Sequence, residues 1–286
     1  MKIATFSIVA RDPETEEFGI AVQSKFLAVG SRGICWAKAG AGAIVTQAMA
    51  NFDFGEIGLP ILEKGYSAEQ VGRALLELDP NKADRQFGIV DAKGGSFTFT
   101  GEKCFDYAGG ICGENFAAQG NILENEETVK ALVETFQNSE GPLAKRLVDC
   151  LEAAQSAGGD RRGRQAAALY IAREGASYGG YNDTAVDLRV DDHPEPIQEL
   201  RRLLELHELY FGQTKEEDRL PLDEEMILKI QEKLKELEYY KGEPNGTWDE
   251  ETQEAFMGFA GWENYEERVL EGPYIDALVY HALLEK

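Results

Sequence analysis

The sequence is poor in histidine and in basic residues, and it contains no long apolar run. Its 286 residues include 3 histidines, and 29 Lys and Arg stand against 52 Asp and Glu, a formal net charge of −23. That excess of negative charge argues against nucleic acid or an anionic membrane surface as a partner. No run of about 18 apolar residues is present, so we expect no membrane span. The apolar stretch at the N-terminus is too short for a signal peptide, and we expect a cytoplasmic protein.

Signatures of metal and cofactor sites are also missing. The four cysteines are Cys35, Cys104, Cys112 and Cys150. They show no CxxC spacing, which argues against a zinc or thioredoxin-like site and favours reduced thiols. The sequence has no HExxH and no P-loop. We therefore expect neither a metal nor a cofactor.

What is present is a strand-rich first half followed by a mixture of helices and strands. Alternating or apolar runs between turn signals predict strands at residues 4–11, 18–24, 33–38, 42–47, 86–91, 96–100, 116–121, 165–173 and 186–190. Helical spacing predicts helices at residues 58–64, 67–78, 126–138, 142–157 and 196–211. Ser67 and Gln70 have the spacing of a capping box. This order predicts an α+β fold with mostly antiparallel strands, not a repeating βαβ fold.

Charge density and turn composition indicate a domain boundary near residue 211. Residues 211–286 include 20 acidic and 8 basic residues. The other 32 acidic and 21 basic residues lie in residues 1–210. Residues 212–222 are polar and suit a linker, and three short helices are expected within residues 223–286. We therefore expect a first domain over residues 1–211 and a three-helix domain over 223–286. The leucine-rich segment 196–211 favours a homodimer.

Polar side chains gather on or at the ends of the predicted strands. They are Thr5, Ser7, Ser24, Thr46, Gln47, Asn51, Gln119 and Asn121. A hydroxyl group is a poor nucleophile until a neighbouring base takes its proton. Lys25, or an α-amino group freed at Thr5, would be such a base. The alternative is that strand-end Ser, Thr and Asn side chains only satisfy the hydrogen bonds of turns.

Residues 158–165 bring three arginines together between glycines in an otherwise acidic chain. Asp160, Arg161, Arg162 and Arg164 lie in this run. Arginine binds carboxylate or phosphate in a bidentate manner, so the run suits an anionic substrate group. Basic residues and glycine are equally typical of a helix C-terminus. Of the three histidines, His193 is the better candidate for a catalytic site, and a turn before Pro194 is the alternative explanation.

Six separated motifs resemble one bacterial and archaeal family, domain of unknown function 1028. They are TFSIVARD (5–12), AVQSKF (21–26), TQA (46–48), QGN (119–121), GGDRRGRQ (158–165) and VDLRVDDHP (186–194). The resemblance covers about residues 1–211. It implies an N-terminal-nucleophile (Ntn) hydrolase-like fold, a four-layer αββα sandwich with two antiparallel sheets between helices.

The resemblance also implies a function, because Ntn hydrolases cleave amide bonds with an N-terminal Thr, Ser or Cys whose own α-amino group is the base. Thr5 would be the nucleophile here, but four residues precede it and Met removal alone would expose Lys2. An internal Thr5 has no free amine, so Lys25 is the substitute base. The expected function is hydrolysis of a C–N amide bond in a small substrate, and the alternative is a non-catalytic anion-binding or scaffold protein.

The remaining candidate residues take two roles in this hypothesis. Gln47 and Asn121 would stabilise the oxyanion, and Arg161 or Arg164 would hold a substrate carboxylate. The other residues expected to contact the substrate are Ser7, Ser24, Thr46, Asn51, Gln119, Asp160 and His193.

The C-terminal part is similar to peptidoglycan-binding-like three-helix domains over about residues 223–284. The resemblance rests on Ile230, Gln231, Leu234, Leu237, Tyr239, Tyr240, Gly242, Asn245, Gly246, Thr247, Trp248, Thr252, Ala255, Phe256 and Phe259. Read from the residues alone, these positions form a helical core with a turn at Asn245 and Gly246. The negative charge of this part favours an interaction or oligomerisation role, and contact with peptidoglycan is the alternative.

Overall fold

The computed structural model describes residues 5–286, apart from the side chain of Arg32, and divides them into two units. The first unit ends at Leu204, and the second covers Glu205–Lys286. The fold is mixed α+β with antiparallel sheets, as predicted, and the described residues form eight α-helices. No described helix has both the length and the apolar character that crossing a membrane requires.

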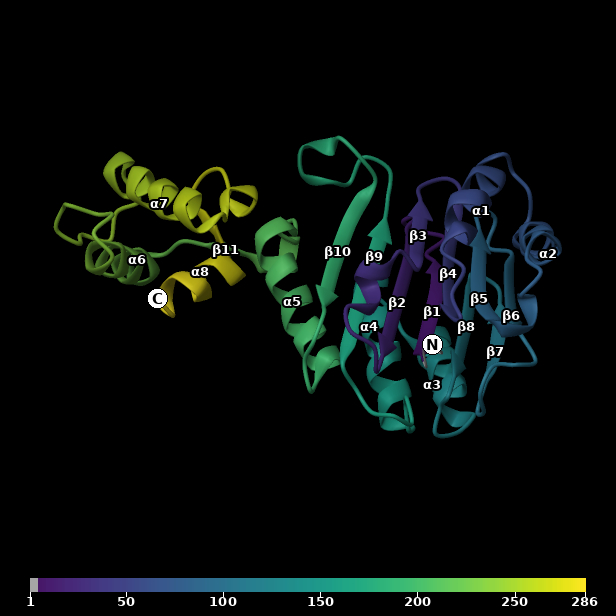
Figure 1. Ribbon diagram of the computed structural model, residues 1–286. Coiled ribbons are helices and arrows are strands. Elements are labelled where there is room, and N and C mark those ends of the chain that lie inside the picture. Colours follow the sequence, from purple (N-terminus) through teal and green to yellow (C-terminus); the bar gives the residue numbers. More distant parts are fainter. Residues whose placement is uncertain (1–4) are drawn as a thin grey trace. The chain divides into compact units, whose positions relative to one another are not determined.

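The first unit contains two antiparallel sheets (Figure 1). The six-stranded sheet has the order β10 (Thr184–Val190), β9 (Ala166–Ala172), β2 (Phe18–Ser24), β1 (Thr5–Arg11), β8 (Phe116–Asn121) and β7 (Gly109–Gly113). The four-stranded sheet has the order β3 (Cys35–Lys38), β4 (Gly42–Ala48), β5 (Arg85–Asp91) and β6 (Ser96–Thr100). Sequence analysis did not predict β7, because its glycine-rich sequence has low strand propensity. The predicted strand at residues 4–11 begins, within the described residues, at Thr5.

Each sheet is covered by a pair of helices on one face. Helices α1 (Asp53–Glu63) and α2 (Ala68–Leu78) share an apolar cluster with the four-stranded sheet, in which Leu62 and Val71 join Ile44. Helices α3 (Glu127–Asn138) and α4 (Leu143–Ser156) share another with the six-stranded sheet, in which Leu132 and Leu147 join Phe6, Ile8 and Ala21. The capping box predicted at Ser67 and Gln70 begins α2.

The two sheets pack against each other through their other faces. Val9 and Ile20 of the six-stranded sheet share a buried cluster with Val45 and Val90 of the four-stranded sheet. Successive side chains of a strand point to opposite faces, so Ser7 and Thr5, two and four positions before Val9, also face the opposite sheet. This alternation positions the candidate site.

The second unit is a small helical domain with its own core. Its elements are the end of α5 (Pro196–Phe211), the two-stranded sheet of β11 (Arg219–Pro221) and β12 (Tyr274–Asp276), and helices α6 (Glu224–Glu236), α7 (Glu250–Glu263) and α8 (Ala277–Leu284). Asp223, Asp249 and Asp276 cap the three helices. The segment predicted as a linker contains β11, which pairs with β12, and the boundary between the units lies inside α5.

Candidate active site between the sheets

The space between the sheets is apolar at one end and polar at the other. Thr5 and Ser7 of β1 and Gln119 and Asn121 of β8 belong to the polar end, and all four are at most 1% exposed. Other strands complete the group, which we call the inter-sheet network. Its members are Thr5, Ser7, Ser24, Gln47, Gln86, Thr98, Thr100, Gln119 and Asn121. Side-chain hydrogen bonds join Thr5 to Ser24 and join the other seven to one another, and Gln47 Nε2 links the two sets through the Thr5 carbonyl.

Thr5 lies at the start of β1, next to the centre of the six-stranded sheet. Its Oγ1 donates a hydrogen bond to Ser24 Oγ at 3.2 Å, and its carbonyl oxygen accepts one from Gln47 Nε2 at 3.3 Å. Thr5 is directly opposite Asn121 in the pairing of β1 with β8. Side chains of such a pair lie on the same face about 5 Å apart at Cβ. The fold thus brings the predicted nucleophile together with both predicted oxyanion donors, Gln47 and Asn121.

Ser7 is held more tightly than Thr5. Its Oγ donates to Gln47 Oε1 at 2.7 Å and accepts from Gln119 Nε2 at 2.7 Å. Gln119 Nε2 also donates to the Ser7 carbonyl at 3.2 Å, and Gln119 Oε1 accepts from Thr98 Oγ1 at 3.2 Å. The hydroxyl proton of Ser7 is therefore committed to an amide oxygen, which is not a base.

Gln86 is at the centre of the network, although sequence analysis did not select it. Its Oε1 accepts from Gln47 Nε2 and from Asn121 Nδ2, both at 2.8 Å. Its Nε2 donates to the Gly120 carbonyl at 2.7 Å, to Thr100 Oγ1 at 2.9 Å and to the Gly109 carbonyl at 3.2 Å. Gln86 lies at the end of a predicted strand, so the pattern that selected Gln47 would also have found it.

The inter-sheet network contains hydroxyl and amide groups and no ionisable side chain. The predicted base, Lys25, is exposed, and its Nζ donates to the carbonyl oxygen of Arg164 at 3.2 Å. Its backbone N–H donates to Asp160 Oδ2 at 2.8 Å. The chemistry of the network is consequently that of hydrogen-bond donors and a hydroxyl nucleophile that requires a base from elsewhere.

The predicted anion-binding residues form a separate polar group. Asp160 is 3% exposed, and its carboxylate accepts hydrogen bonds from Arg162. Arg164 forms an ion pair with Glu195, whose backbone N–H donates to His193 Nδ1 at 3.1 Å. Arg161 is exposed. The structure therefore brings Arg164 and His193 to one residue, Glu195, through its carboxylate and its backbone N–H respectively. Arg161 is the arginine of this run whose side chain faces solvent without a partner among the described residues.

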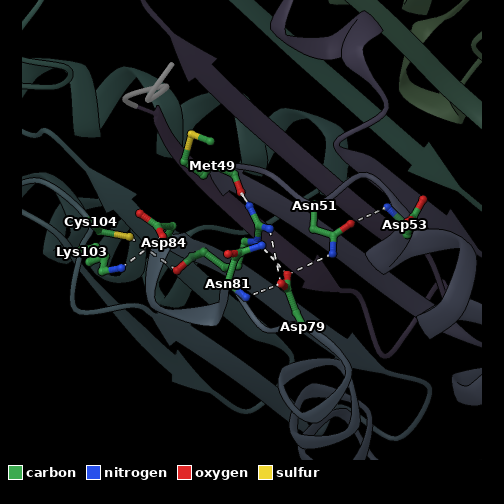
Figure 2. A network of polar contacts seen from close by, with 9 residues as sticks. Met49, Asn51, Asp53, Asp79, Asn81, Asp84, Lys103 and Cys104 are labelled. Carbon is green, nitrogen blue, oxygen red and sulfur yellow. Dashed lines mark hydrogen bonds and ion pairs between the residues drawn. The ribbon is translucent and has the colours of Figure 1, made fainter.

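Thr46 and Asn51 lie apart from Gln47. Thr46 shares the face of β4 with Ile44, which packs against α1 and α2, and its buried hydroxyl has no partner among the described residues. Asn51 Nδ2 donates to Asp79 Oδ2 at 3.0 Å (Figure 2). Burial alone would raise the pKa of Asp79, but hydrogen bonds from Arg85, Asn51 and the Asn81 backbone hold the pKa below its usual value. Asn51 therefore belongs to a structural ion-pair network.

Two strained backbone positions border the inter-sheet network. Ala48 has φ 63° and directly follows Gln47, and Ile122 has φ 52° and directly follows Asn121. A β-branched residue rarely adopts positive φ, and such strain persists only where the surrounding structure enforces it. The chain therefore turns sharply after each of the two predicted oxyanion residues.

The described residues contain neither a cluster of metal ligands nor, at Cys35 and Cys150, a reactive thiol. In residues 5–286 no group of three His, Cys, Asp or Glu side chains is arranged to hold a metal ion. Burial raises the pKa of the Cys35 thiol and of the Cys150 thiol to about 12, with nearby Asp187 and Asp149 adding to the shift. A thiol with that pKa is a poor nucleophile at neutral pH.

Comparison with known families decides the identity of the first unit. Residues 5–200 match the model of the family of unknown function DUF1028. The chain belongs to this family. Residues 210–283 match a second model, described as "Putative peptidoglycan binding domain". Both resemblances expected from the sequence are thus confirmed.

A solved structure supports the same assignment. The chain is similar to the crystal structure of a DUF1028 protein from Silicibacter pomeroyi, with 29% sequence identity and a TM-score of 0.66. The match covers 74% of this chain and 94% of that one. No protein with a curated description matches the chain.

Proposed function

We propose that the chain is an Ntn-type amidohydrolase, with Thr5 as the nucleophile and the polar end of the inter-sheet space as the active site. Two helix pairs enclose two facing antiparallel sheets, an order that suits the αββα sandwich of Ntn hydrolases. The substrate is a small molecule with a C–N amide bond, and exposed Arg161 suits a negatively charged group on it.

The observation that carries the proposal is the lack of a base around a well-positioned hydroxyl. Thr5 faces hydroxyl and amide groups, and Lys25 Nζ is bound to the carbonyl oxygen of Arg164. An α-amino group on Thr5 itself would supply the missing base within the same residue. The proposal therefore requires removal of the four residues that precede Thr5.

The steps then balance with the groups present. The α-amine of Thr5 takes the Oγ1 proton as Oγ1 attacks the amide carbon, which forms a tetrahedral oxyanion. The N–H groups of the network stabilise that charge. The protonated amine gives its proton to the leaving nitrogen, the C–N bond breaks, and an ester to Thr5 remains. Water, deprotonated by the same amine, hydrolyses the ester and restores the Thr5 hydroxyl.

Of the two predicted oxyanion residues, Asn121 fits the role better. Both protons of Gln47 Nε2 are engaged, one by the Thr5 carbonyl and one by Gln86 Oε1. In the described part of the chain, Asn121 Nδ2 makes one hydrogen bond, to Gln86 Oε1. An amide nitrogen carries two protons, so one N–H of Asn121 is available beside Thr5.

Intact-mass measurement of the purified protein before and after incubation in cell extract tests the proposal, followed by an assay with a panel of small amides and ureides. We expect a fraction that begins at Thr5, and turnover by that fraction. Thr5→Ala should abolish turnover and leave the fold intact. Turnover by a chain that keeps its first four residues, or unchanged turnover by Thr5→Ala, would contradict the mechanism.

A non-catalytic binding or scaffold role is the second candidate, and the burial of the site favours it. Thr5 is 0% exposed, and the network satisfies most of its own donors and acceptors. A thermal-shift screen with carboxylates, amides and ureides separates the two functions. Stabilisation without product supports binding, and product release supports the enzyme.

For the second unit we propose a contact role, with a protein partner or with peptidoglycan. The match to a peptidoglycan-binding model supports it, and exposed Trp262 and Met257 on α7 offer an apolar contact surface. Co-sedimentation of the full chain with purified peptidoglycan tests it, with Trp262→Ala as the comparison. If the full chain stays in the supernatant, the peptidoglycan alternative fails.

Cytoplasmic location and a homodimer remain predictions. The leucines of α5 already pack within the chain: Leu203 and Leu204 contact the core of the first unit, and Leu209 contacts that of the second. Light scattering of the purified protein would decide the oligomeric state.

A further inference from the structure

Backbone carbonyls orient three amides of the inter-sheet network: one each for Gln47 and Gln119, and two for Gln86. Gln86 Nε2 faces the carbonyl oxygens of Gly120 and Gly109, which can only accept hydrogen bonds. The other end of the amide, Oε1, must therefore be the acceptor. It faces Gln47 and Asn121, which must each present a nitrogen to it.

The Gln47 and Gln119 amides each have a backbone carbonyl of their own. Gln47 Nε2 faces the Thr5 carbonyl and Gln86, so its Oε1 is left facing Ser7 and accepts the Ser7 hydroxyl proton. Gln119 Nε2 donates to the Ser7 carbonyl and to Ser7 Oγ, and Gln119 Oε1 accepts from Thr98. Asn121 Nδ2, by contrast, donates to Gln86 Oε1 and to no backbone carbonyl of the described residues, so its orientation depends on Gln86.

We propose that Gln86 is a positioning residue that sets the direction of the Asn121 hydrogen bonds beside Thr5. It turns the N–H of Asn121, and not its carbonyl oxygen, toward the face that Thr5 shares. It also supports the orientation of Gln47, which the Thr5 carbonyl fixes independently. The catalytic part of this inference rests on the proposed function, whereas the control of hydrogen-bond direction does not.

Replacement of Gln86 by Glu tests the inference, because a carboxyl group reproduces the amide only when it is protonated. The protonated acid donates to one of the two glycine carbonyls and accepts from Gln47 and Asn121. The carboxylate places an oxygen against the carbonyls of Gly109 and Gly120, so it is disfavoured in the folded state. The folded-state pKa of the introduced carboxyl is then raised above the unfolded value of about 4.3.

The sign of the pH effect follows from the proton count. The folded variant holds a proton that the unfolded variant releases, so folding stability is complete below about pH 4 and falls as the pH rises. We expect the unfolding constant of Gln86→Glu, relative to wild type, to rise about tenfold per pH unit until the folded pKa is reached. Urea unfolding of the full chain from pH 4 to pH 8 measures it. A variant that does not fold at neutral pH is refolded at pH 4.5 and titrated upward.

Two further variants separate the effect of hydrogen-bond direction at Gln86 from the effect of the volume that its side chain fills. Gln86→Met fills similar volume but can neither donate nor accept, so its loss of stability should be the same at every pH. Gln70→Glu is the matched control, since Gln70 Oε1 accepts from Ser67 N–H in a capping box where a carboxylate serves equally well. Equal losses for Gln86→Glu and Gln86→Met across the pH range would overturn the inference.

A second measurement separates this inference from the proposed function. The chain that begins at Thr5 is treated with a β-lactone electrophile, and acylation of Thr5 is followed by mass. We expect Gln86→Met to slow acylation of Thr5 at least tenfold. In Gln86→Glu, the acylation rate and the stability should both fall as the pH rises. If Thr5 never reacts but the pH-dependent stability is observed, the proposed function fails and the role of Gln86 in setting direction stands. If Thr5 reacts equally fast in all variants, the role of Gln86 in catalysis fails.

Discussion

The hydroxyl of Thr5, the first described residue of β1, donates a hydrogen bond to the hydroxyl of Ser24, the last residue of β2, at 3.2 Å. Both side chains are fully buried. The bond aligns the Thr5 hydroxyl within the sheet, at the edge of a network that carries no charge. The reactivity of Thr5 therefore depends on what its neighbours accept and on whether an amine is present at its own nitrogen.

Ser24→Ala removes the hydrogen-bond acceptor of Thr5 and tests whether Ser24 orients it. We expect a loss of about 1 kcal/mol in the free energy of unfolding and about tenfold slower acylation of Thr5, the effect of roughly 1.4 kcal/mol. Ser96→Ala is the control, because Ser96 also lies on a strand and donates to the Gly113 carbonyl, away from Thr5. If both variants slow acylation equally, Ser24 has no orienting role.

Asp79→Asn tests the ion-pair network that holds the segment after β4. Asp79 accepts from Arg85 at 2.7 Å, and Arg85 also donates to the Met49 carbonyl (Figure 2). The loss of the charge leaves a largely buried guanidinium unpaired, so we expect a cost of about 3 kcal/mol at pH 7. The exposed pair of Glu69 and Arg73 is the control, and Glu69→Gln should cost less than about 1 kcal/mol.

The pH dependence of this effect has a definite sign. The pKa of Asp79 is lowered in the folded protein, so its contribution is present above the unfolded value of about 3.9 and is lost as the pH falls through the folded pKa. The difference in stability between wild type and Asp79→Asn should therefore shrink below about pH 4. A constant difference from pH 7 to pH 2.5 in urea unfolding would contradict this account.

Asp276→Ala tests the core of the second unit. Asp276 Oδ1 caps α8, and Oδ2 accepts from the buried Arg268 at 2.7 Å. We expect a cost of about 3–5 kcal/mol, because the buried Arg268 guanidinium loses its buried carboxylate and keeps only the half-exposed Glu208. Asp249→Ala removes a cap that accepts from Thr252 but pairs with no buried charge, so it should cost less than Asp276→Ala. Unfolding followed by Trp248 fluorescence measures both, and similar costs would show that Arg268 contributes little.

Local patterns in the sequence predicted much of the fold. The alternation of Thr5, Ser7 and Val9 against Phe6 and Ile8 predicted a strand with two different faces, and the structure confirms it. The pairing of β1 with β8 and of β2 with β9 could not be predicted, because partners more than 100 residues apart leave no local signal. Strand β7 was missed because its short, glycine-rich sequence has low strand propensity.

The candidate site was predicted in part. Strand-end polarity selected Thr5, Ser7, Gln47, Gln119 and Asn121, which the structure brings into one network. The same criterion could not separate Gln47 from its neighbour Thr46, because which face of β4 meets the other sheet depends on tertiary packing. Nor could it show that Lys25 Nζ lies at the Arg164 carbonyl, since that contact depends on the fold of a distant loop.

The most direct test of the central claim is the rate of Thr5 acylation by a β-lactone in two forms of the chain, one that begins at Thr5 and one that keeps the preceding four residues. The account predicts a single adduct on Thr5 in the first form only, absent in Thr5→Ala. The rate should rise with pH and level off above an apparent pKa near 8, about the value of an α-amino group. Equal labelling of both forms, or labelling at Ser7 or Lys25 instead, would contradict it.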